Sequence, residues 1–243
     1  RRQRQMCIRD RSYYLSTRNI FAGEYPGDKY GEKAEKKINQ MIHFGVRHFI
    51  DLTEEGELRP YSHLLPKECT YTRFPILDVS VPDSSKSVHR LICHIQELSQ
   101  RGDGYVYIHC RSGVGRTGTI VACYLAEDMR TSSTDITADF VLERLRMCFT
   151  EMPRSAHRVT PETKEQEAFI RKYVGSLNEK EEERKRRVKD CIRGSLMAGA
   201  AGDALGYPVE FMSRNAILAR YGDKGIAEFK LDSDGKALVS DDT

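Results

Sequence analysis

The chain has no tryptophan, no long apolar run and little net charge. Among its 243 residues no hydrophobic stretch approaches the roughly 20 residues of a membrane-spanning helix. Hydrophobic residues at 39% and charged residues at 31% exclude collagen-like and wholly disordered chains. The formal charge is +3, and the first eleven residues alone contribute five arginines against one aspartate. The rest has no basic surplus, so the sequence indicates a soluble, globular protein without nucleic-acid or membrane partners.

Paired cysteine motifs are also missing. Six cysteines outside the first eleven residues are scattered without a C-x-x-C pair: Cys69, Cys93, Cys110, Cys123, Cys148 and Cys191. A chain of this length forms a core without disulfides, so the pattern favours a reducing compartment and predicts a cytoplasmic location. Residues 1–11 lack the apolar centre of a signal peptide and resemble a translated sequencing adapter, and we set them aside as an artefact tail.

Strand-like and helix-like segments alternate in the first two thirds of the chain. Strands are expected at residues 18–22, 46–52, 71–77 and 105–108, and helices at 34–42, 88–98, 117–129, 136–145 and 161–174. Alternation of this kind predicts an α/β fold, with a largely parallel central sheet flanked by helices.

The composition changes sharply after Gly175. Residues 179–193 contain twelve charges in fifteen positions, with glutamates four residues before basic partners, as in a solvated helix. The residues that follow are rich in glycine and other small side chains. The expected divisions are an artefact tail at 1–11, a first domain at 12–175, a charged helical linker at 176–193 and a second domain at 194–243.

The strongest chemical signal is the segment His-Cys-Arg-Ser-Gly-Val-Gly-Arg-Thr-Gly at residues 109–118, between a predicted strand and a predicted helix. A loop containing Gly113 and Gly115 can point successive backbone N–H groups inward and form an anion-binding nest at a helix N-terminus. The same dipoles and the Arg116 guanidinium would stabilise a thiolate at Cys110. Arg116 can also clamp two phosphate oxygens with its planar fork.

This segment resembles the His-Cys-x5-Arg-Ser/Thr signature of cysteine-dependent protein tyrosine phosphatases and matches every defining position. The resemblance implies that Cys110 forms a thiophosphate intermediate and that Thr117 steadies the leaving thiolate. It also implies that His109 orients the loop, and that no cofactor is needed. The implied phosphate-binding residues are Arg111, Ser112, Gly113, Val114, Gly115 and Arg116.

A general acid is also required, and two aspartates compete for the role. The absence of tryptophan excludes the W-P-D loop of the large tyrosine phosphatases, and the spacing from Asp78 to Cys110 is similar to that of the compact dual-specificity class. We therefore favour Asp78, leaving Asp83 as the alternative acid or as a loop or helix-cap residue. Gln166 would either position the hydrolytic water or lie on a helix surface.

The resemblance implies a phosphorylated protein substrate, with phosphotyrosine and also phosphoserine or phosphothreonine as targets. The loop interior has none of the extra lysines typical of phosphoinositide phosphatases. One alternative is a non-catalytic module that binds phosphoproteins and recruits the second domain. Another is an enzyme that acts on ADP-ribose-linked or nucleotide phosphates.

Residues 194–211 resemble the first helix and loop of ADP-ribosylglycohydrolases, and the resemblance continues to Thr243. In that family the triplet matching Ser240, Asp241 and Asp242 holds Mg²⁺, and the glutamate matching Glu210 lies nearby. The family fold is much longer, so we expect an incomplete, inactive all-α segment at the end of this chain. The parent protein would then combine a phosphatase with an ADP-ribosyl hydrolase.

Overall fold

A computed structural model of the chain describes six stretches: residues 12–15, 19–27, 32–130, 136–152, 157–224 and 226–237. The chain divides into two compact units, Arg1–Glu179 and Lys180–Thr243. We describe each unit separately.

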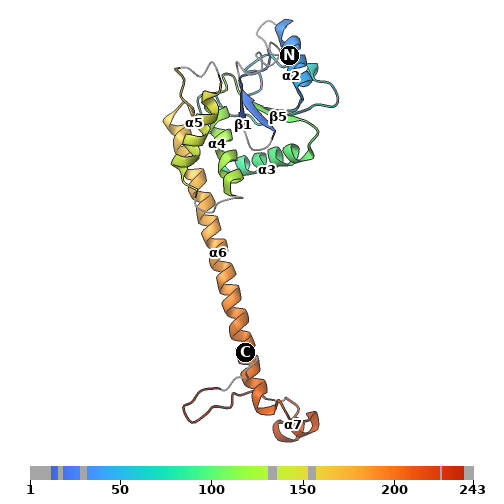
Figure 1. Ribbon diagram of the computed structural model, residues 1–243, viewed down its shortest axis with the longest axis vertical. Helices are drawn as coiled ribbons and strands as arrows, with labels where there is room; N and C mark the ends of the chain where they lie inside the picture. Colours follow the sequence, from blue (N-terminus) through green and yellow to red (C-terminus); the bar gives the residue numbers. More distant parts are fainter. Residues whose placement is uncertain are drawn as a thin grey trace. The chain divides into compact units, whose positions relative to one another are not determined.

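The first unit is built on a five-stranded sheet (Figure 1). The strands are β1 (Ser12–Leu15), β2 (Ile20–Gly23), β3 (Val46–Asp51), β4 (Thr70–Arg73) and β5 (Tyr105–His109). Their order across the sheet is β1-β2-β5-β3-β4, and every pair except the antiparallel β1–β2 pair is parallel. This confirms the predicted α/β fold with a largely parallel sheet.

Helices cover both faces of this sheet. They are α2 (Glu32–Phe44), α3 (Ser85–Arg101), α4 (Gly115–Arg130), α5 (Ala138–Thr150) and the start of α6 (Lys164–Gly206). Side chains alternate in direction along β5, so Val106 and Ile108 join the core formed with α3, α4 and α5. Tyr107 and the partly buried Tyr105 join a smaller core on the α2 side. Strand β5 is therefore covered on both faces, and its carboxyl end carries the candidate nucleophile.

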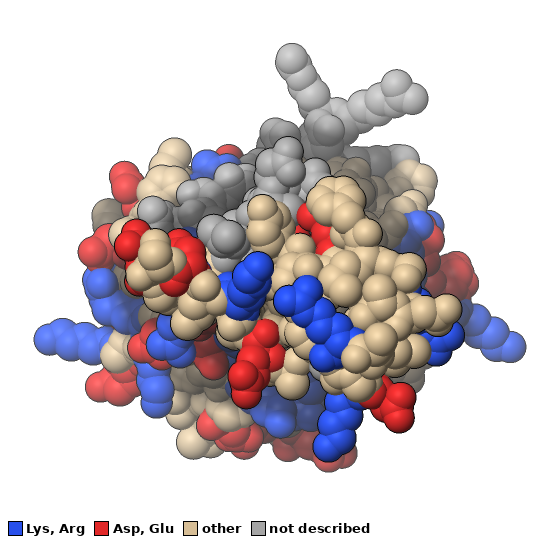
Figure 2. Space-filling model, turned by 90° about the horizontal axis from the view of Figure 1, so that it is seen from below, with Lys and Arg blue, Asp and Glu red and all other residues tan. Residues whose placement is uncertain are grey.

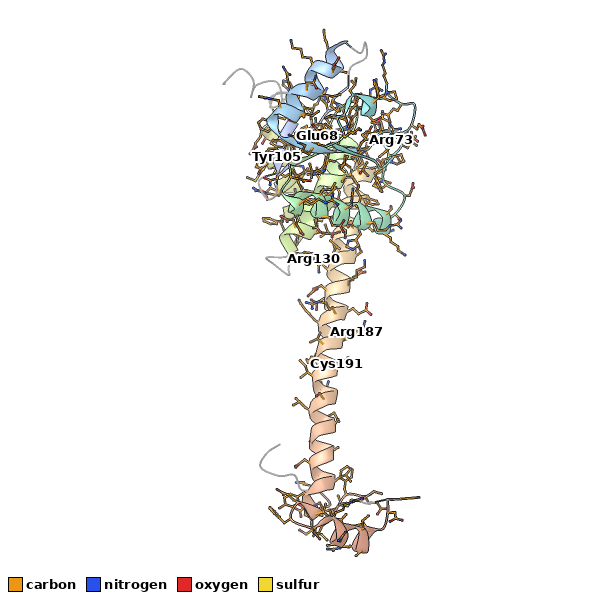
Figure 3. All side chains as sticks on the ribbon, turned by 90° about the vertical axis from the view of Figure 1, so that its right-hand side faces the viewer. Glu68, Arg73, Tyr105, Arg130, Arg187 and Cys191 are labelled. Atoms are coloured by element: carbon orange, nitrogen blue, oxygen red, sulfur yellow. The ribbon has the colours of Figure 1, made fainter. Side chains whose placement is uncertain are left out.

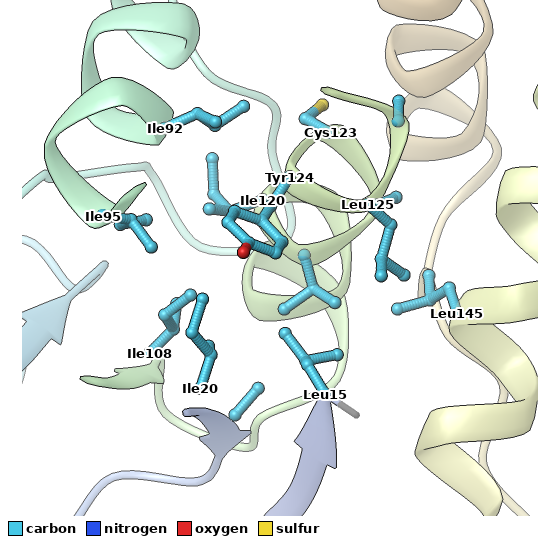
Figure 4. Close-up of a cluster of buried hydrophobic side chains, with 14 of the residues drawn as sticks. Leu15, Ile20, Ile92, Ile95, Ile108, Ile120, Cys123, Tyr124, Leu125 and Leu145 are labelled. Carbon is cyan, nitrogen blue, oxygen red and sulfur yellow. The ribbon is translucent and has the colours of Figure 1, made fainter. Parts of the chain in front are cut away.

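In the larger core, side chains from strands and helices pack together around α4 (Figure 4). Ile20 and Ile108 from the sheet meet Ile92 of α3 and Ile120 of α4, and all four side chains are fully buried. Close packing of this kind fixes α4 on the sheet. The loop that joins β5 to α4 is consequently anchored at both ends.

Three elements differ from the sequence predictions. Strand β1 was not predicted, and β4 ends at Arg73, four residues before the expected end at Leu77. Pro75 cannot donate to a ladder, although Phe74 N still donates to Asp51 O at 2.8 Å. The helix expected to end at Val174 continues through Gly175 to Gly206, because the charged residues that follow are good helix formers.

The second unit contains the end of α6, a 3₁₀ turn at Tyr207–Val209, and α7 (Arg214–Tyr221). Residues 182–199 of α6 are all exposed, and Figure 3 labels Arg187 and Cys191 in this stretch. Among the described residues of this unit, Ala204 alone is buried. No helix in the described part of the chain is long and apolar enough to cross a membrane.

Charges of both signs are distributed over the surface. Figure 2 shows Lys and Arg side chains interspersed with Asp and Glu on the face in view. Neighbouring opposite charges also pair along α6, where Arg184 and Lys185 contact Glu181 and Glu182 at 2.8 and 2.9 Å. Such exposed pairs contribute little to stability, so they characterise a solvated helix rather than a packed one.

Candidate active site

The loop between β5 and α4 places Cys110 beneath a helix N-terminus. Cys110 is 2% exposed, and its Sγ accepts a hydrogen bond from Gly113 N at 3.3 Å. Gly113 has a φ of +74°, and a Cβ there would lie 2.4 Å from the carbonyl carbon of Gly23. Only glycine fits this backbone angle and this contact. The end of β2 therefore supports the loop that holds the thiol.

Arg116 reaches the same place from the first turn of α4, and its side chain is buried. Its two terminal nitrogens donate to Glu57 at 2.6 and 2.7 Å, and Nη1 also donates to Ile76 O at 3.0 Å. Nη2 lies 2.8 Å from Asp78 Oδ1. Among the described residues, Nε has no hydrogen-bond partner. The guanidinium is thus fixed by two carboxylates, with one buried N–H left for a further acceptor.

Glu57 is a site residue that the sequence analysis missed. The hydrogen bond from Arg116 holds the pKa of Glu57 below its usual value. Burial lowers the pKa of Arg116, but the hydrogen bond to Glu57 and the nearby Cys110 outweigh burial and raise it. Both groups therefore carry their charges at neutral pH. The pair keeps a buried positive charge beside Cys110, as oxyanion binding requires.

The structure separates the two candidate acids. Asp78 lies on an exposed turn and contacts Arg116. Its side chain is 47% exposed. Asp83 is exposed and precedes Ser84, whose side chain accepts a hydrogen bond from Ser87 N and caps α3. The residue next to Asp83 is therefore the helix cap. Of the two aspartates, Asp78 is the one held at the arginine beside Cys110.

His109 lies beneath the loop and is fully buried. Its Nε2 is 2.7 Å from the Tyr61 hydroxyl, and its Nδ1 is 3.8 Å from Asp51 Oδ1. The rings of Tyr25 and Tyr107 lie 5.6 Å from the His109 ring. Burial lowers the pKa of His109 to about 4, against a smaller opposing effect of Asp51. The imidazole is therefore neutral at pH 7, and the Tyr61 hydroxyl holds it in place.

The remaining predicted loop residues line the turn from strand to helix. Arg111 is exposed, and its carbonyl accepts a hydrogen bond from Tyr25 N at 3.3 Å. Thr117 is fully buried, and its Oγ1 has no hydrogen-bond partner among the described residues. An unpartnered buried hydroxyl can donate to an anion that forms nearby. The buried members of the loop are Gly113, Val114, Gly115, Arg116 and Thr117.

Gln166 is buried with none of its surface exposed, so the helix-surface interpretation is wrong. Its side chain donates from Nε2 to Ser80 O at 3.0 Å, in the turn that carries Asp78. Ser80 lies 86 residues earlier in the sequence. No local sequence signal could have paired two such distant segments.

The predicted magnesium ligands Ser240, Asp241 and Asp242 lie outside the described residues. Glu210 is exposed and follows the 3₁₀ turn at Tyr207–Val209. Within the stretches that the structure describes, no group of three or more histidine, cysteine or acidic side chains could hold a metal ion. The magnesium site therefore stays a prediction from sequence.

A buried thiol at a helix N-terminus, an arginine fixed beside it and a carboxylate on the facing turn define the class of cysteine-dependent phosphatases. A family model described as "Swiss Army Knife protein, DSP-PTPase phosphatase domain" matches residues 30–170, and the chain belongs to this family. A second model, ADP-ribosylglycohydrolase, matches residues 184–243. Both resemblances expected from the sequence are thus confirmed.

Curated relatives are phosphatases of several kinds. A candidate tyrosine phosphatase, 067L of Invertebrate iridescent virus 3, is 27% identical over 174 residues, 68% of this chain and 66% of that protein. The human dual specificity protein phosphatase CDC14C is 28% identical over 72 residues, 30% of this chain and 16% of that protein. The chain thus spans just under two thirds of the viral relative and far less of the human one.

Solved structures share the fold. Tk-PTP in a mutant form is 20% identical, with a TM-score of 0.53 over 71% of this chain and 97% of that one. Kinase associated phosphatase, with its catalytic cysteine replaced by serine, is 18% identical, with a TM-score of 0.53 over 69% of this chain and 94% of that one. These likenesses support the fold of the first unit.

Proposed function

We propose that the first unit hydrolyses phosphate monoesters of phosphorylated proteins through a cysteinyl-phosphate intermediate. The observation that carries this proposal is the meeting of Cys110, Arg116 and Asp78 at one loop. Gly113 N donates to the Cys110 sulfur at 3.3 Å, and Arg116 lies 2.8 Å from the Asp78 carboxylate. Nucleophile, oxyanion clamp and acid are therefore within reach of one phosphate group.

The proposed reaction has two displacements at phosphorus. The Cys110 thiolate forms an S–P bond while the P–O bond to the leaving group breaks, and Asp78 gives that oxygen its proton. The loop N–H groups and Arg116 bind the remaining phosphate oxygens. Water then forms a P–O bond as the S–P bond breaks, giving its proton to Asp78. The Thr117 hydroxyl donates a hydrogen bond to the departing thiolate and keeps its proton.

We assign phosphotyrosine as a substrate, with phosphoserine and phosphothreonine as further ones. The names of the relatives, which include tyrosine and dual specificity phosphatases, support this range. The loop interior of Ser112, Gly113, Val114 and Gly115 carries no lysine that would favour inositol phosphates. Asp78 is our proposed acid, with Asp83 as the alternative.

Three parts of the proposal rest on sequence alone. The proposed phosphatase mechanism needs no metal ion, because every step above uses groups of the chain and one water molecule. The parent protein also carries an ADP-ribosyl hydrolase whose Mg²⁺ would be held by Ser240, Asp241 and Asp242, with Glu210 nearby. The six scattered cysteines after residue 11, which form no C-x-x-C pair, support a cytoplasmic location.

Turnover of a simple aryl phosphate tests the proposal against the binding-module alternative. We expect the full chain to release phosphate from an aryl phosphate and from a phosphotyrosine peptide in buffer containing a metal chelator. Oxyanion binding without turnover would instead favour a non-catalytic phosphoprotein-binding module. Activity that disappears with the chelator would contradict the metal-free mechanism.

A further inference from the structure

One buried amide near the start of α6 is shared by three segments of the first unit. The side-chain oxygen Oε1 of Gln166 accepts hydrogen bonds from Glu162 N at 3.0 Å and Thr163 N at 3.2 Å. The backbone N–H of Gln166 in turn donates to Thr163 Oγ1 at 3.2 Å. These bonds satisfy N–H groups that the first turn of a helix leaves without partners. The oxygen of the side-chain amide therefore caps the N-terminus of α6.

The other half of the amide holds the turn that carries Asp78. Nε2 of Gln166 donates to Ser80 O at 3.0 Å, and Ser80 N closes the turn on Leu77 O at 3.1 Å. Leu77 and Val79 are 61% and 58% exposed, so the turn buries little apolar surface of its own. Between the buried Ile76 and Pro82, this turn is held by the hydrogen bond from Gln166 and by the contact of Asp78 with Arg116.

The same amide also packs against the phosphate-binding loop. A Cβ on Gly115 would lie 2.9 Å from Nε2 and 3.0 Å from Oε1 of Gln166. Gly115 directly precedes Arg116, and its lack of a side chain makes room for the amide. Gln166 thus contacts the loop that binds phosphate and the turn that supplies the acid.

We propose that Gln166 is a positioning residue that fixes the Asp78 turn relative to the phosphate-binding loop. This inference rests on the proposed phosphatase function. Gln166 acts through its hydrogen bond to the backbone of Ser80. Its loss leaves nucleophile and oxyanion clamp in place but lets the acid drift from the leaving-group oxygen. A displacement of about 1 Å from productive geometry costs up to roughly 10²-fold in rate.

The test compares two esters in the full chain and in Gln166→Met, which keeps the side-chain length and removes the amide. One ester has a good leaving group, a nitrophenol, and needs little acid catalysis, while phenyl phosphate has a poor one. We expect phenyl phosphate turnover to fall roughly 10- to 10²-fold, with nitrophenyl phosphate turnover and vanadate affinity within about 3-fold of the parent. Equal losses on both esters would overturn the inference.

Thr163→Ala is the matched control. It removes the hydroxyl that accepts from Gln166 N, so it weakens the start of α6 but keeps the hydrogen bond to Ser80. We expect this variant to keep the parent's ratio of the two rates. The same selective loss in Thr163→Ala would show that the helix end, and not the bond to Ser80, produces the effect.

A double-variant cycle separates positioning from a general structural role. If Gln166 acts through Asp78, adding Gln166→Met to Asp78→Asn causes no further loss on phenyl phosphate. If the rate loss of the double variant equals the product of the two single-variant losses, the inference is overturned. A parent chain that hydrolyses neither ester would instead contradict the proposed function itself.

Gln166→Glu serves if the methionine variant does not fold. The glutamate keeps an oxygen for the N–H groups of Glu162 and Thr163 and loses the donor to Ser80. It should slow phenyl phosphate turnover selectively, as Gln166→Met does. Parent-like turnover of phenyl phosphate by a folded Gln166→Glu chain would overturn the inference.

Discussion

The two units of the chain differ most in what they bury. The first unit closes two hydrophobic cores on the faces of its sheet, whereas the described residues of the second bury Ala204 alone. Burial matters to the proposed chemistry because a dry environment strengthens the hydrogen bonds and charges that act on phosphate. Cys110, Arg116 and Thr117 are all buried, whereas Glu210 is exposed. The comparison places an organised chemical site in the first unit.

Amide hydrogen exchange in α4 and α7 tests the difference in burial between the two units. Both are helices, but α4 lies in the larger core and α7 contains no buried residue. We expect amide hydrogens of α7 to exchange at least roughly 10³-fold faster than those of residues 116–126, because exposed helices open without global unfolding. Equal protection of the two helices would contradict the difference in burial.

Replacing the acid tests the site within the first unit. Asp78→Asn should slow the hydrolysis of phenyl phosphate by roughly 10²–10⁴-fold and that of a nitrophenyl ester only slightly, because only a poor leaving group needs the proton. The alkaline limb of the pH–rate profile should also flatten. Asp83→Asn is the control, and we expect it to behave as the parent. The reverse result would make Asp83 the acid.

Acid should weaken the first unit through His109. The pKa of this buried imidazole is lowered from 6.5 to about 4, so the unfolded chain binds the proton more readily. The contribution of His109 to the free energy of unfolding is present above its unfolded pKa of 6.5. It is lost as the pH falls from there through the folded pKa of about 4. Between pH 7.5 and 5 the free energy of unfolding should drop by about 2 kcal/mol from His109 alone. Urea titrations of the parent and of His109→Gln would measure this, and equal slopes in the two would refute it.

The smallest expected effect is that of removing the second unit. Deleting residues 180–243 should leave aryl-phosphate turnover within about 2-fold, because every side chain proposed to act lies before Lys180. The measurement is kcat/KM for the shortened and the full chain. A large loss would mean that the second unit supports the site.

The sequence predicted those parts of the fold that have a local cause. The apolar stripe of Val88, Ile92 and Ile95 forms the buried face of α3, and Gly102 ends that helix with a φ of +72°. Strand β1 has only four residues and pairs antiparallel with β2, so no pattern distinguished it. The sequence pattern predicts a helix that ends just before Gly175. A glycine inside a helix lowers its stability by only about 1 kcal/mol, and strong helix formers follow this one, so the helix continues.

At the active site, too, residues close together in the sequence could be predicted and contacts between distant segments could not. Cys110 and Arg116 could be predicted because strand, loop and helix are consecutive in the sequence. The Glu57 partner of Arg116 lies 59 residues away, and its contact depends on the packing of the whole sheet. Asp78 was favoured over Asp83 by spacing, but its contact with Arg116 appears only in three dimensions.

The central claim is that the Cys110 sulfur is the nucleophile, and Cys110→Ser tests it most directly. The substitution changes one atom and leaves the backbone nest and Arg116 to bind oxyanions. We predict a fall in aryl-phosphate turnover of at least roughly 10⁴-fold, with vanadate or phosphate still bound. Residual turnover within a few-fold of the parent chain would contradict the account.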